Sequence, residues 1–253
     1  MPDPLAQARE ALRLARRVVI FTGAGVSAES GVPTFRGPGG LWKAFRPEDL
    51  ATPEALARDP RLVWEWYAWR RGLVAACAPN AAHGAIAEWV ARRPGVTLIT
   101  QNVDDLHEQA ARVAGAPDGP PALLKLHGAL FSDRCSRCAR AAPAGPVDAT
   151  SPATLPRCPA CGALLRPGVV WFGEMLPAGV FEAAGAAAAG SDICLVVGTA
   201  GTVHPAAGLV HAAREAGARI AVVDPAATAY DDVAEFRFTA PAGEIVPRLL
   251  GSP

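Results

Sequence analysis

Residues 18–28 have the sequence VVIFTGAGVSA, a short β-branched run that leads directly into a glycine-rich turn. The preceding residues 5–16 have apolar side chains at helical spacing behind Asp3, which can cap a helix. A helix, a buried strand and a glycine-rich loop therefore open the fold. Backbone N–H groups in such a loop can approach a pyrophosphate closely, so a dinucleotide is the expected ligand. Taken alone the pattern is modest, because the third glycine of GxGxxG falls at Ala28 and an ordinary turn fits nearly as well.

Similar apolar runs recur along the chain and alternate with alanine-rich helical stretches. The apolar runs are residues 96–100, 123–126, 169–172, 193–197, 220–223 and 236–238, and the helical stretches are residues 80–92, 104–113, 178–189 and 205–216. Continuous apolar strands alternating with helices are typical of a parallel sheet covered on both faces. We predict an α/β fold with a doubly wound parallel sheet, a Rossmann-like domain formed by residues 1–130 and 169–253.

The composition is that of a globular protein without net charge. The 253 residues include 24 Lys and Arg against 24 Asp and Glu, and 51% are hydrophobic, which excludes a disordered chain. A neutral chain has no overall field to attract nucleic acid or an anionic membrane, so neither is an expected partner. The N-terminus lacks the basic end of a signal peptide, and Asp192 interrupts the best candidate for a membrane span. We expect a cytoplasmic protein, and its oligomeric state stays open.

Four of the six cysteines lie in a segment that breaks the alternating pattern. Residues 131–168 are rich in Pro and Arg and short of helical periodicity, and we predict that they form a zinc-ribbon insert within a small domain. Two disulfides are the alternative, but a reducing compartment favours free thiolates. Two CxxC pairs nineteen residues apart can supply a closed tetrahedral site for one structural zinc ion. The predicted ligands are Cys135, Cys138, Cys158 and Cys161.

Polar residues follow two of the predicted strands, at the edge where doubly wound sheets bind ligands. Residues 100–107 have the sequence TQNVDDLH, and residues 125–128 have the sequence KLHG. Asp104 or Asp105 could cap the next helix, and His107 could be a core or helix-surface histidine. His127 is a stronger candidate, because a histidine at a strand end with a near-neutral pKa can take a proton from a hydroxyl group.

Several motifs occur in one order and together resemble the sirtuins, which are NAD-dependent protein-lysine deacylases. They are residues 23–37 (GAGVSAESGVPTFRG), residues 100–107, the His127-Gly128 pair, the four-cysteine ribbon, residues 169–174 (VVWFGE) and the Gly198-Thr199 pair. The resemblance extends from about Arg17 to the C-terminal helix. Tyr67 and Arg70 are similar to the pair that marks the class III branch, which favours acidic acyl groups.

The resemblance implies a role for each matching residue. His127 is the general base, residues 169–172 pair with the substrate backbone, and Tyr67 and Arg70 bind the acyl group. The substrate-binding set is therefore Tyr67, Arg70, Val169, Val170, Trp171 and Phe172. The NAD-binding set is Gly23, Ala24, Gly25, Ser27, Ala28, Glu29, Thr34, Phe35, Arg36, Trp42, Gln101, Asn102, Asp104, Gly198, Thr199, Ala200, Asp224, Pro225, Ala226 and Ala242.

Three positions depart from the family pattern. Ala200 stands where serine is usual, Asp224 where asparagine is usual at the adenine ribose, and His204 where class III members often have tyrosine. Ala200 removes a hydroxyl contact, whereas Asp224 can still accept hydrogen bonds from ribose hydroxyls. We therefore expect these departures to change the affinity for NAD rather than the role of NAD as the co-substrate.

The implied function is NAD-dependent removal of succinyl, malonyl and also acetyl groups from protein lysine side chains, which gives nicotinamide, 2′-O-acyl-ADP-ribose and free lysine. A protein that acts mainly as a deacetylase or as a mono-ADP-ribosyltransferase is the alternative within the family. An NAD-dependent dehydrogenase would share the sheet but would not account for residues 101–104, His127 and the ribbon together. A zinc-ribbon nucleic-acid module would use arginines such as Arg134 and Arg137, which in this arginine-rich chain fit a solvated face better.

Overall fold

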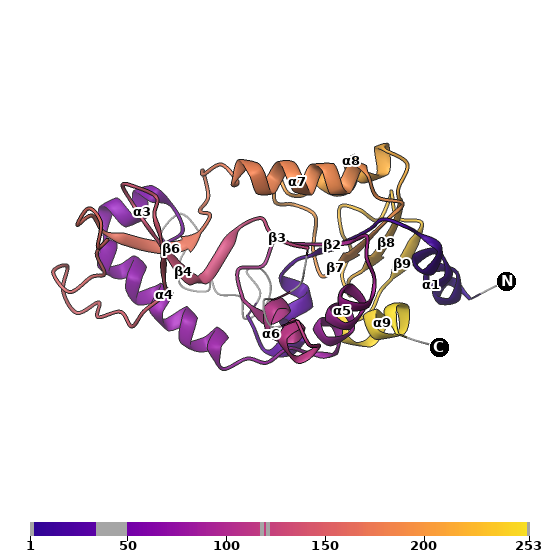
Figure 1. The fold of residues 1–253 in the computed structure, drawn as a ribbon, viewed down its shortest axis with the longest axis horizontal. Coiled ribbons are helices and arrows are strands. Elements are labelled where there is room, and N and C mark those ends of the chain that lie inside the picture. The colour runs from indigo at the N-terminus through magenta and orange to yellow at the C-terminus, as the bar shows by residue number, and fades with distance from the viewer. Residues whose placement is uncertain (1–2, 34–49, 117–118, 120–121, 252–253) are drawn as a thin grey trace.

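The structure is a computed structural model that describes residues 3–33, 50–116, 119 and 122–251. It consists of a large α/β part and a smaller part at one end of an elongated molecule (Figure 1). The elements of the large part are α1 (Pro4–Leu14), β1 (Val18–Thr22), the 3-10 helix η1 (Ala24–Ser30), α5 (Ala81–Arg92), β2 (Val96–Thr100), α6 (Leu106–Val113), β3 (Leu123–Lys125), α7 (Ala178–Ala189), β7 (Ile193–Val197), α8 (Gly208–Glu215), β8 (Arg219–Val223), β9 (Phe236–Phe238) and α9 (Ala242–Leu250). Those of the smaller part are α3 (Pro53–Arg58), α4 (Pro60–Ala75), β4 (Gly128–Cys135), β5 (Ala141–Pro143) and β6 (Leu165–Val169).

The large sheet has six strands in the order β3-β2-β1-β7-β8-β9, and every pair is parallel. Strands β1 and β7 are both buried along their whole length, as expected for strands covered on both faces of the sheet. This is the predicted doubly wound α/β fold, and that prediction is confirmed.

Alternate residues of β1 contribute to two separate hydrophobic cores, because successive side chains of a strand point to opposite faces. Val18 and Ile20 pack with buried residues of α1, α5 and α9, whereas Val19 and Phe21 pack with those of α7 and α8. Figure 1 shows α7 and α8 on one side of the sheet and α5 and α9 on the other. None of the helices in the described ranges has the length and apolarity that crossing a membrane needs.

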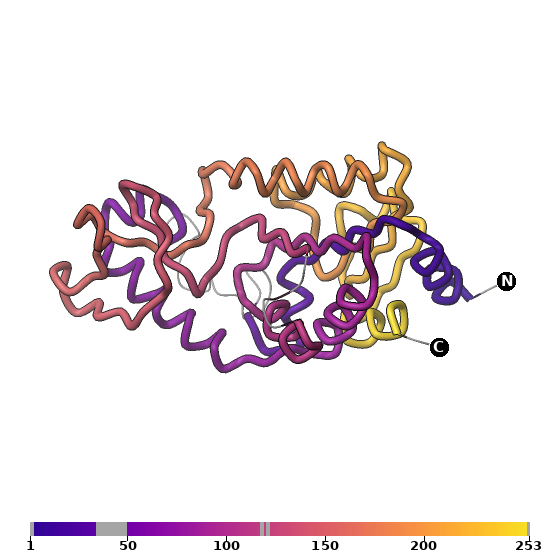
Figure 2. Tube along the Cα trace, viewed as in Figure 1, coloured from indigo at the N-terminus to yellow at the C-terminus, as the bar shows by residue number. Residues whose placement is uncertain are grey.

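The smaller part contains an antiparallel sheet of three strands in the order β5-β4-β6, and it includes the predicted ribbon segment, residues 131–168. Helix α4 completes its core, because Trp64 packs with Cys135, Leu155 and Leu165 and donates a hydrogen bond from Nε1 to the Leu165 carbonyl. In Figure 2 the segments that link α4 to α5, β3 to β4 and β6 to α7 run between the two parts of the molecule. The domain boundaries themselves stay a prediction.

The predicted position of one strand is wrong. Residues 169–172 were expected in the parallel sheet, but β6 ends at Val169 and pairs antiparallel with β4 in the smaller sheet. Val169 and Trp171 are buried, whereas 49% of the Phe172 surface is exposed. Residues 169–172 therefore have a buried and an exposed side, which could not be inferred from their uniformly apolar sequence.

Candidate active site and metal centre

The glycine-rich loop after β1 lies against the end of β7, and β2 lies on the other side of β1. Gly25 donates a backbone hydrogen bond of 2.8 Å to the Gly198 carbonyl. A Cβ on Gly25 would lie 2.7 Å from Gly198 Cα, and a Cβ on Gly23 would lie 2.6 Å from Thr199 Cβ. Close packing thus requires both glycines. Doubly wound folds bind dinucleotides in the crevice that forms where the strand order changes direction.

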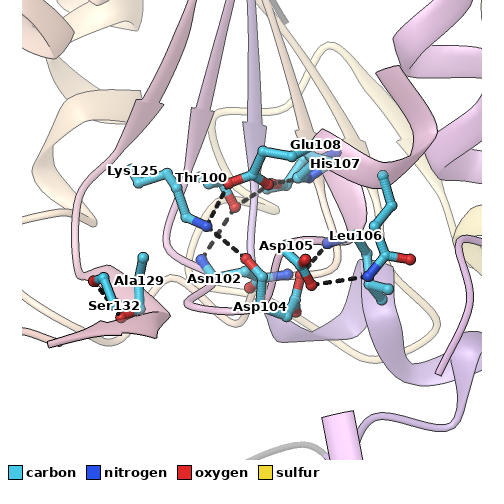
Figure 3. A network of polar contacts seen from close by, with 12 residues as sticks. Thr100, Asn102, Asp104, Asp105, Leu106, His107, Glu108, Lys125, Ala129 and Ser132 are labelled. Atoms are coloured by element: carbon cyan, nitrogen blue, oxygen red, sulfur yellow. Dashed lines mark hydrogen bonds and ion pairs between the residues drawn. The ribbon is translucent and has the colours of Figure 1, made fainter. Parts of the chain in front are cut away.

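A buried polar cluster lies next to this loop and contains three predicted NAD-binding residues. The Ser27 hydroxyl donates to Asp104 Oδ2 at 3.0 Å, and Asn102 Nδ2 donates to Ser27 Oγ at 3.1 Å. Burial raises the pKa of the Asp104 carboxyl group, although Leu106 N–H and the Ser27 hydroxyl oppose this shift by donating hydrogen bonds to it. Figure 3 shows Asn102 and Asp104 on the loop between β2 and α6, with Lys125 reaching over from β3. Lys125 Nζ donates to the Asp104 carbonyl at 2.6 Å.

His127 lies just beyond β3, and its ring is tied to the loop after β2. Its Nδ1 is 2.8 Å from the carbonyl oxygen of Gln101. A carbonyl oxygen only accepts hydrogen bonds, so Nδ1 carries the hydrogen and Nε2 is left as the basic nitrogen. Burial lowers the pKa of His127 below its ordinary 6.5, which keeps the ring neutral at pH 7. Gln101 in turn donates from Nε2 to Thr199 Oγ1 at 3.0 Å, which connects this loop to the end of β7.

Two functional candidates were missed by the sequence reasoning, Asn80 and His83. Asn80 caps α5 and donates from Nδ2 to the Val26 carbonyl at 2.8 Å, so it holds the glycine-rich loop in place. His83 is fully buried, and its Nε2 lies 3.4 Å from Ser27 Oγ. Burial lowers the pKa of His83 to about 4. A signal did exist, because asparagine occurs only at positions 80 and 102 of this chain.

His107 is a core histidine, which was one of the two alternatives. Its Nε2 lies 3.0 Å from the Thr22 hydroxyl, and its ring centroid lies 4.9 Å from that of His83. Burial holds the pKa of His107 well below its ordinary value. Asp105 occupies the N-cap position of α6, but it is Asp104 Oδ1 that accepts a hydrogen bond from an N–H of the first turn.

Two groups of predicted NAD-binding residues, 198–200 and 224–226, follow β7 and β8, which are neighbouring parallel strands. The resemblance implies that they bind the adenosine half of NAD together with Ala242. Asp224 comes directly after β8, and its Oδ1 accepts a hydrogen bond of 2.9 Å from Ala226 N. Partial burial raises the pKa of this carboxyl group. Glu29 Oε2 accepts a hydrogen bond of 2.6 Å from Gly243 N, so Glu29 connects η1 to the start of α9 beside Ala242. Four predicted NAD-binding residues lie outside the described ranges: Thr34, Phe35, Arg36 and Trp42.

Tyr67 and Arg70 are both buried on one face of α4. Arg70 lines a cavity together with Ala24, Ser27, Asn102 and Asp104, so a predicted acyl-binding residue and four predicted NAD-binding residues share one cavity. Burial lowers the pKa of Arg70, while Tyr67 and Asp104 act against that shift by electrostatic attraction. A guanidinium group keeps its charge in spite of such a shift, so the cavity wall carries the positive charge of Arg70 as well as the Asp104 carboxyl group.

Residues 169–172 lie next to the candidate base. Val170 N donates a hydrogen bond of 2.8 Å to the His127 carbonyl, and Phe172 N donates one of 3.0 Å to the Ala51 carbonyl. Trp171, in the loop after β6, is buried and packs in one hydrophobic cluster with residues of α4 such as Tyr67. A backbone hydrogen bond therefore links the predicted substrate-binding segment, residues 169–172, directly to the candidate base.

The four predicted zinc ligands converge in the smaller part. Their Sγ atoms all lie within 4.8 Å of one another, and Cys138 Sγ lies 3.8 Å from both Cys158 Sγ and Cys161 Sγ, whereas Cys135 Sγ lies 3.4 Å from Cys161 Sγ. A tetrahedral ion with Zn–S bonds of about 2.3 Å needs sulfur atoms ~3.8 Å apart, so the cysteines fit zinc. Backbone N–H groups of Cys138 and Arg137 donate to Cys135 Sγ and lower the pKa of that thiol to about 6, which favours the thiolate that zinc binds. Four protein ligands leave no open position, as in a structural site.

The fold and the site together define an α/β protein with a dinucleotide-binding crevice and a four-cysteine zinc centre in a smaller domain. The Sir2 family matches residues 23–205, and this protein belongs to that family. The predicted resemblance to sirtuins is confirmed.

Curated relatives cover nearly the whole chain. An NAD-dependent protein deacylase of Ralstonia nicotianae is 49% identical over 97% of this chain and 95% of its own length. NAD-dependent protein deacylase 2 of Pyrobaculum aerophilum is 46% identical over 94% of this chain and 92% of its own length.

A solved complex of a Sir2 homologue with NAD has a TM-score of 0.86 and 42% identity, covering 99% of this chain and 93% of that one. A more distant Sir2 structure, with a TM-score of 0.83 and 27% identity, covers 97% of this chain and 96% of its own. It contains a deacetylated p53 peptide and 3′-O-acetyl ADP-ribose.

Proposed function

We propose that this protein removes acyl groups from lysine side chains of proteins with NAD as the co-substrate, and that it prefers succinyl and malonyl groups while also accepting acetyl. The observation that carries the reaction is the His127 ring. Its Nδ1 is held by the Gln101 carbonyl, and its neutral Nε2 is left to take a proton. This pairing is what a general base for a hydroxyl group needs.

The residues at the crevice fit NAD. Gly23 and Gly25 bring backbone against the end of β7 with no room for side chains, which is how such loops admit a pyrophosphate. Asn102 and Asp104 offer an amide and a carboxylate for the nicotinamide and ribose groups. NAD, when bound, supplies an electrophilic ribose carbon and neighbouring hydroxyl groups. His127 acts on one of those hydroxyls, and the buried surroundings exclude water from the reaction.

The preference for acidic acyl groups is supported by the buried charge of Arg70. A cavity wall with a guanidinium group offers a partner to the distal carboxylate of a succinyl or malonyl group, which an acetyl group lacks. Desolvation strengthens such a contact, because the same charge in water would interact weakly.

Proteins are the proposed substrates. The curated relatives are named protein deacylases, and a Sir2 structure contains a deacetylated peptide. We also propose a cytoplasmic location, since four cysteines that serve as zinc ligands must stay reduced.

Mass spectrometry of lysine peptides tests the proposal. Acetyl-, malonyl-, succinyl- and glutaryl-lysine versions of one peptide are incubated with the protein and NAD, and peptide and nicotinamide are quantified together. The expected result is one nicotinamide released per acyl group removed, fastest with malonyl or succinyl peptides. Transfer of ADP-ribose to protein without loss of acyl groups, or formation of NADH, would contradict the proposal.

A further inference from the structure

The hydroxyl group of Tyr67 has a buried partner that comes from outside α4. Trp171 Nε1 donates a hydrogen bond of 2.9 Å to the Tyr67 oxygen. Both side chains are almost completely buried, with 1% of Tyr67 and 2% of Trp171 exposed. An indole nitrogen can only donate, so the direction of this bond is fixed and the Tyr67 oxygen is the acceptor.

Two charged groups hold Trp171 in place, one at its ring and one at its backbone N–H. The Arg166 guanidinium carbon lies 3.4 Å from the centroid of the Trp171 ring, and Arg166 is paired with Glu174. Glu174 Oε2 also accepts a hydrogen bond of 2.8 Å from Trp171 N, and its two oxygens accept bonds from Arg134 Nη2 at 3.0 Å. A backbone and a ring constrained in this way leave the indole N–H little freedom to turn from Tyr67.

The surroundings of Tyr67 then determine where its own hydroxyl hydrogen can go. Arg70 lies three residues further along the same face of α4, and a guanidinium group cannot accept a hydrogen bond. The Trp171 indole, which is bonded to the hydroxyl, and the Arg70 guanidinium, which acts on it electrostatically, are therefore both donors. Burial raises the pKa of Tyr67, so the phenol keeps its hydrogen.

Tyr67 packs in the same hydrophobic cluster as Val32, Val103 and Leu130, three residues that line the cavity with Arg70. Tyr67 and Arg70 thus bring two hydrogen-bond donors to one side of the cavity, where an acceptor group of a ligand can receive them. A carboxylate, which accepts several hydrogen bonds and donates none, is the chemical group that matches.

We propose that Trp171 is a positioning residue for acyl selectivity, which holds the Tyr67 hydroxyl as a donor toward the carboxylate of an acidic acyl group. The inference rests on the proposed function, because it presupposes that Tyr67 and Arg70 bind the acyl group. It adds that selectivity depends on a residue of the 169–172 segment acting through Tyr67.

A double-mutant cycle tests this coupling. The readout is the ratio of kcat/KM for succinyl-lysine peptide to kcat/KM for acetyl-lysine peptide, with kcat and KM resolved separately. We expect Tyr67→Phe to lower the ratio roughly 10- to 100-fold and Trp171→Phe to lower it roughly 3- to 10-fold, chiefly through KM for the succinyl peptide. In the Tyr67→Phe background, adding Trp171→Phe should change the ratio by less than about 2-fold, since the hydroxyl it positions is already gone.

Trp64→Phe is the matched control. Trp64 is also a buried tryptophan whose Nε1 donates a hydrogen bond, but its acceptor is the Leu165 carbonyl. We expect this variant to change stability and leave the selectivity ratio within about 2-fold of wild type. Thermal unfolding of all variants shows which of them fold.

The outcomes separate this inference from the proposed function. A wild-type protein without preference for succinyl over acetyl peptide contradicts the acyl assignment of Tyr67 and Arg70. A wild-type preference that Tyr67→Phe abolishes but Trp171→Phe leaves intact overturns the role of Trp171 alone. Effects of the two substitutions that multiply in the double variant, or a Trp64→Phe variant that lowers the ratio as much as Trp171→Phe, would overturn it as well.

Discussion

The ring of His127 is bound through Nδ1 to the carbonyl oxygen of Gln101 at 2.8 Å. The two residues follow β3 and β2, which are neighbouring parallel strands paired from Leu98↔Leu123 to Thr100↔Lys125. The pairing of the strands therefore brings the base and the carbonyl together, and the hydrogen bond then fixes which nitrogen is basic. The register between β2 and β3 thus determines that Nε2 is the basic nitrogen of His127.

Replacing His127 by alanine should lower turnover by about 10²- to 10⁴-fold while leaving folding and zinc content unchanged. The reason is that the ring contributes a basic nitrogen and, within the described part of the chain, a single hydrogen bond. Steady-state kinetics with circular dichroism and zinc analysis check this. His211→Ala, on helix α8 and in contact with Tyr230, is the control and should keep its activity. A His127→Ala protein that works at nearly the wild-type rate would refute the assignment.

The pH dependence of the wild-type enzyme gives a second test of the same residue. Catalysis needs the neutral ring, and burial lowers the pKa of His127 below 6.5. The kcat/KM value should therefore stay level at neutral pH and fall as the pH drops through that lowered pKa, by about tenfold per unit at its steepest. A decline that begins well above pH 6.5 would show that the ring is not held neutral.

His83 should make the protein sensitive to mild acid. The pKa of His83 is about 4 in the folded state against 6.5 for an exposed histidine, so between these values the unfolded chain binds more protons. Stability is then greatest above pH 6.5 and falls as the pH is lowered through this window. From pH 7 to pH 5 the loss of unfolding free energy from this residue is about 2 kcal/mol.

Urea unfolding at pH 7 and at pH 5 measures that loss. His83→Gln is the useful variant, because glutamine at this third helical position can keep the capping box with Asn80. The difference between the two pH values should shrink by about 2 kcal/mol in the variant. An unchanged difference would mean that His83 accepts a proton in the folded state.

Removal of the zinc ion should unfold the ribbon segment, residues 131–168, of the smaller part. The hydrophobic cluster at the metal consists largely of Cys135, Cys158, Leu155 and Leu165 around Trp64, so two of its buried residues are metal ligands themselves. A chelator, or Cys158→Ala, should change the fluorescence of Trp64 and lower thermal stability together with activity. Elemental analysis should give one zinc per chain, and a fully folded and active Cys158→Ala protein would show that the metal is dispensable.

Much of the site could be predicted because its residues follow strands. His127, Gln101 and Asn102 each come after an apolar run, and parallel strands end at one edge of a sheet. The zinc ligands could be predicted for a similar reason, since CxxC spacing is local in sequence. The direction of residues 169–172 could not, because it depends on which strand Val169 pairs with.

Asn80 and His83 could not be placed in the site from periodicity either. They begin α5, far along the chain from Val26 and Ser27, and only the folding of α5 against η1 brings them into contact. Tyr67 and Arg70 share a helix face, as their spacing predicts, but the contact of Tyr67 with Trp171 joins residues 104 positions apart. Contacts of this kind depend on tertiary packing and leave no pattern in the local sequence.

The last prediction concerns Arg70. Arg70→Met keeps most of the side-chain volume but removes the charge beside the cavity, so a carboxylate-bearing acyl group should lose a charge-assisted contact worth about 1.5 to 3 kcal/mol. We expect kcat/KM for succinyl-lysine peptide to fall roughly 10- to 150-fold, and that for acetyl-lysine peptide to fall much less.

The neighbouring Arg71 provides the control for that experiment. Arg71 is equally buried, but it donates to the Leu130 carbonyl and forms an ion pair with Asp133 at 2.5 Å, so its contacts lie within the smaller part. Arg71→Met should lower stability and reduce both activities by a similar factor, since removing one partner of a buried pair leaves the other charge uncompensated. If Arg70→Met also reduced both activities equally, Arg70 would be a structural residue like Arg71, and selection of acidic acyl groups would have to come from elsewhere in the cavity.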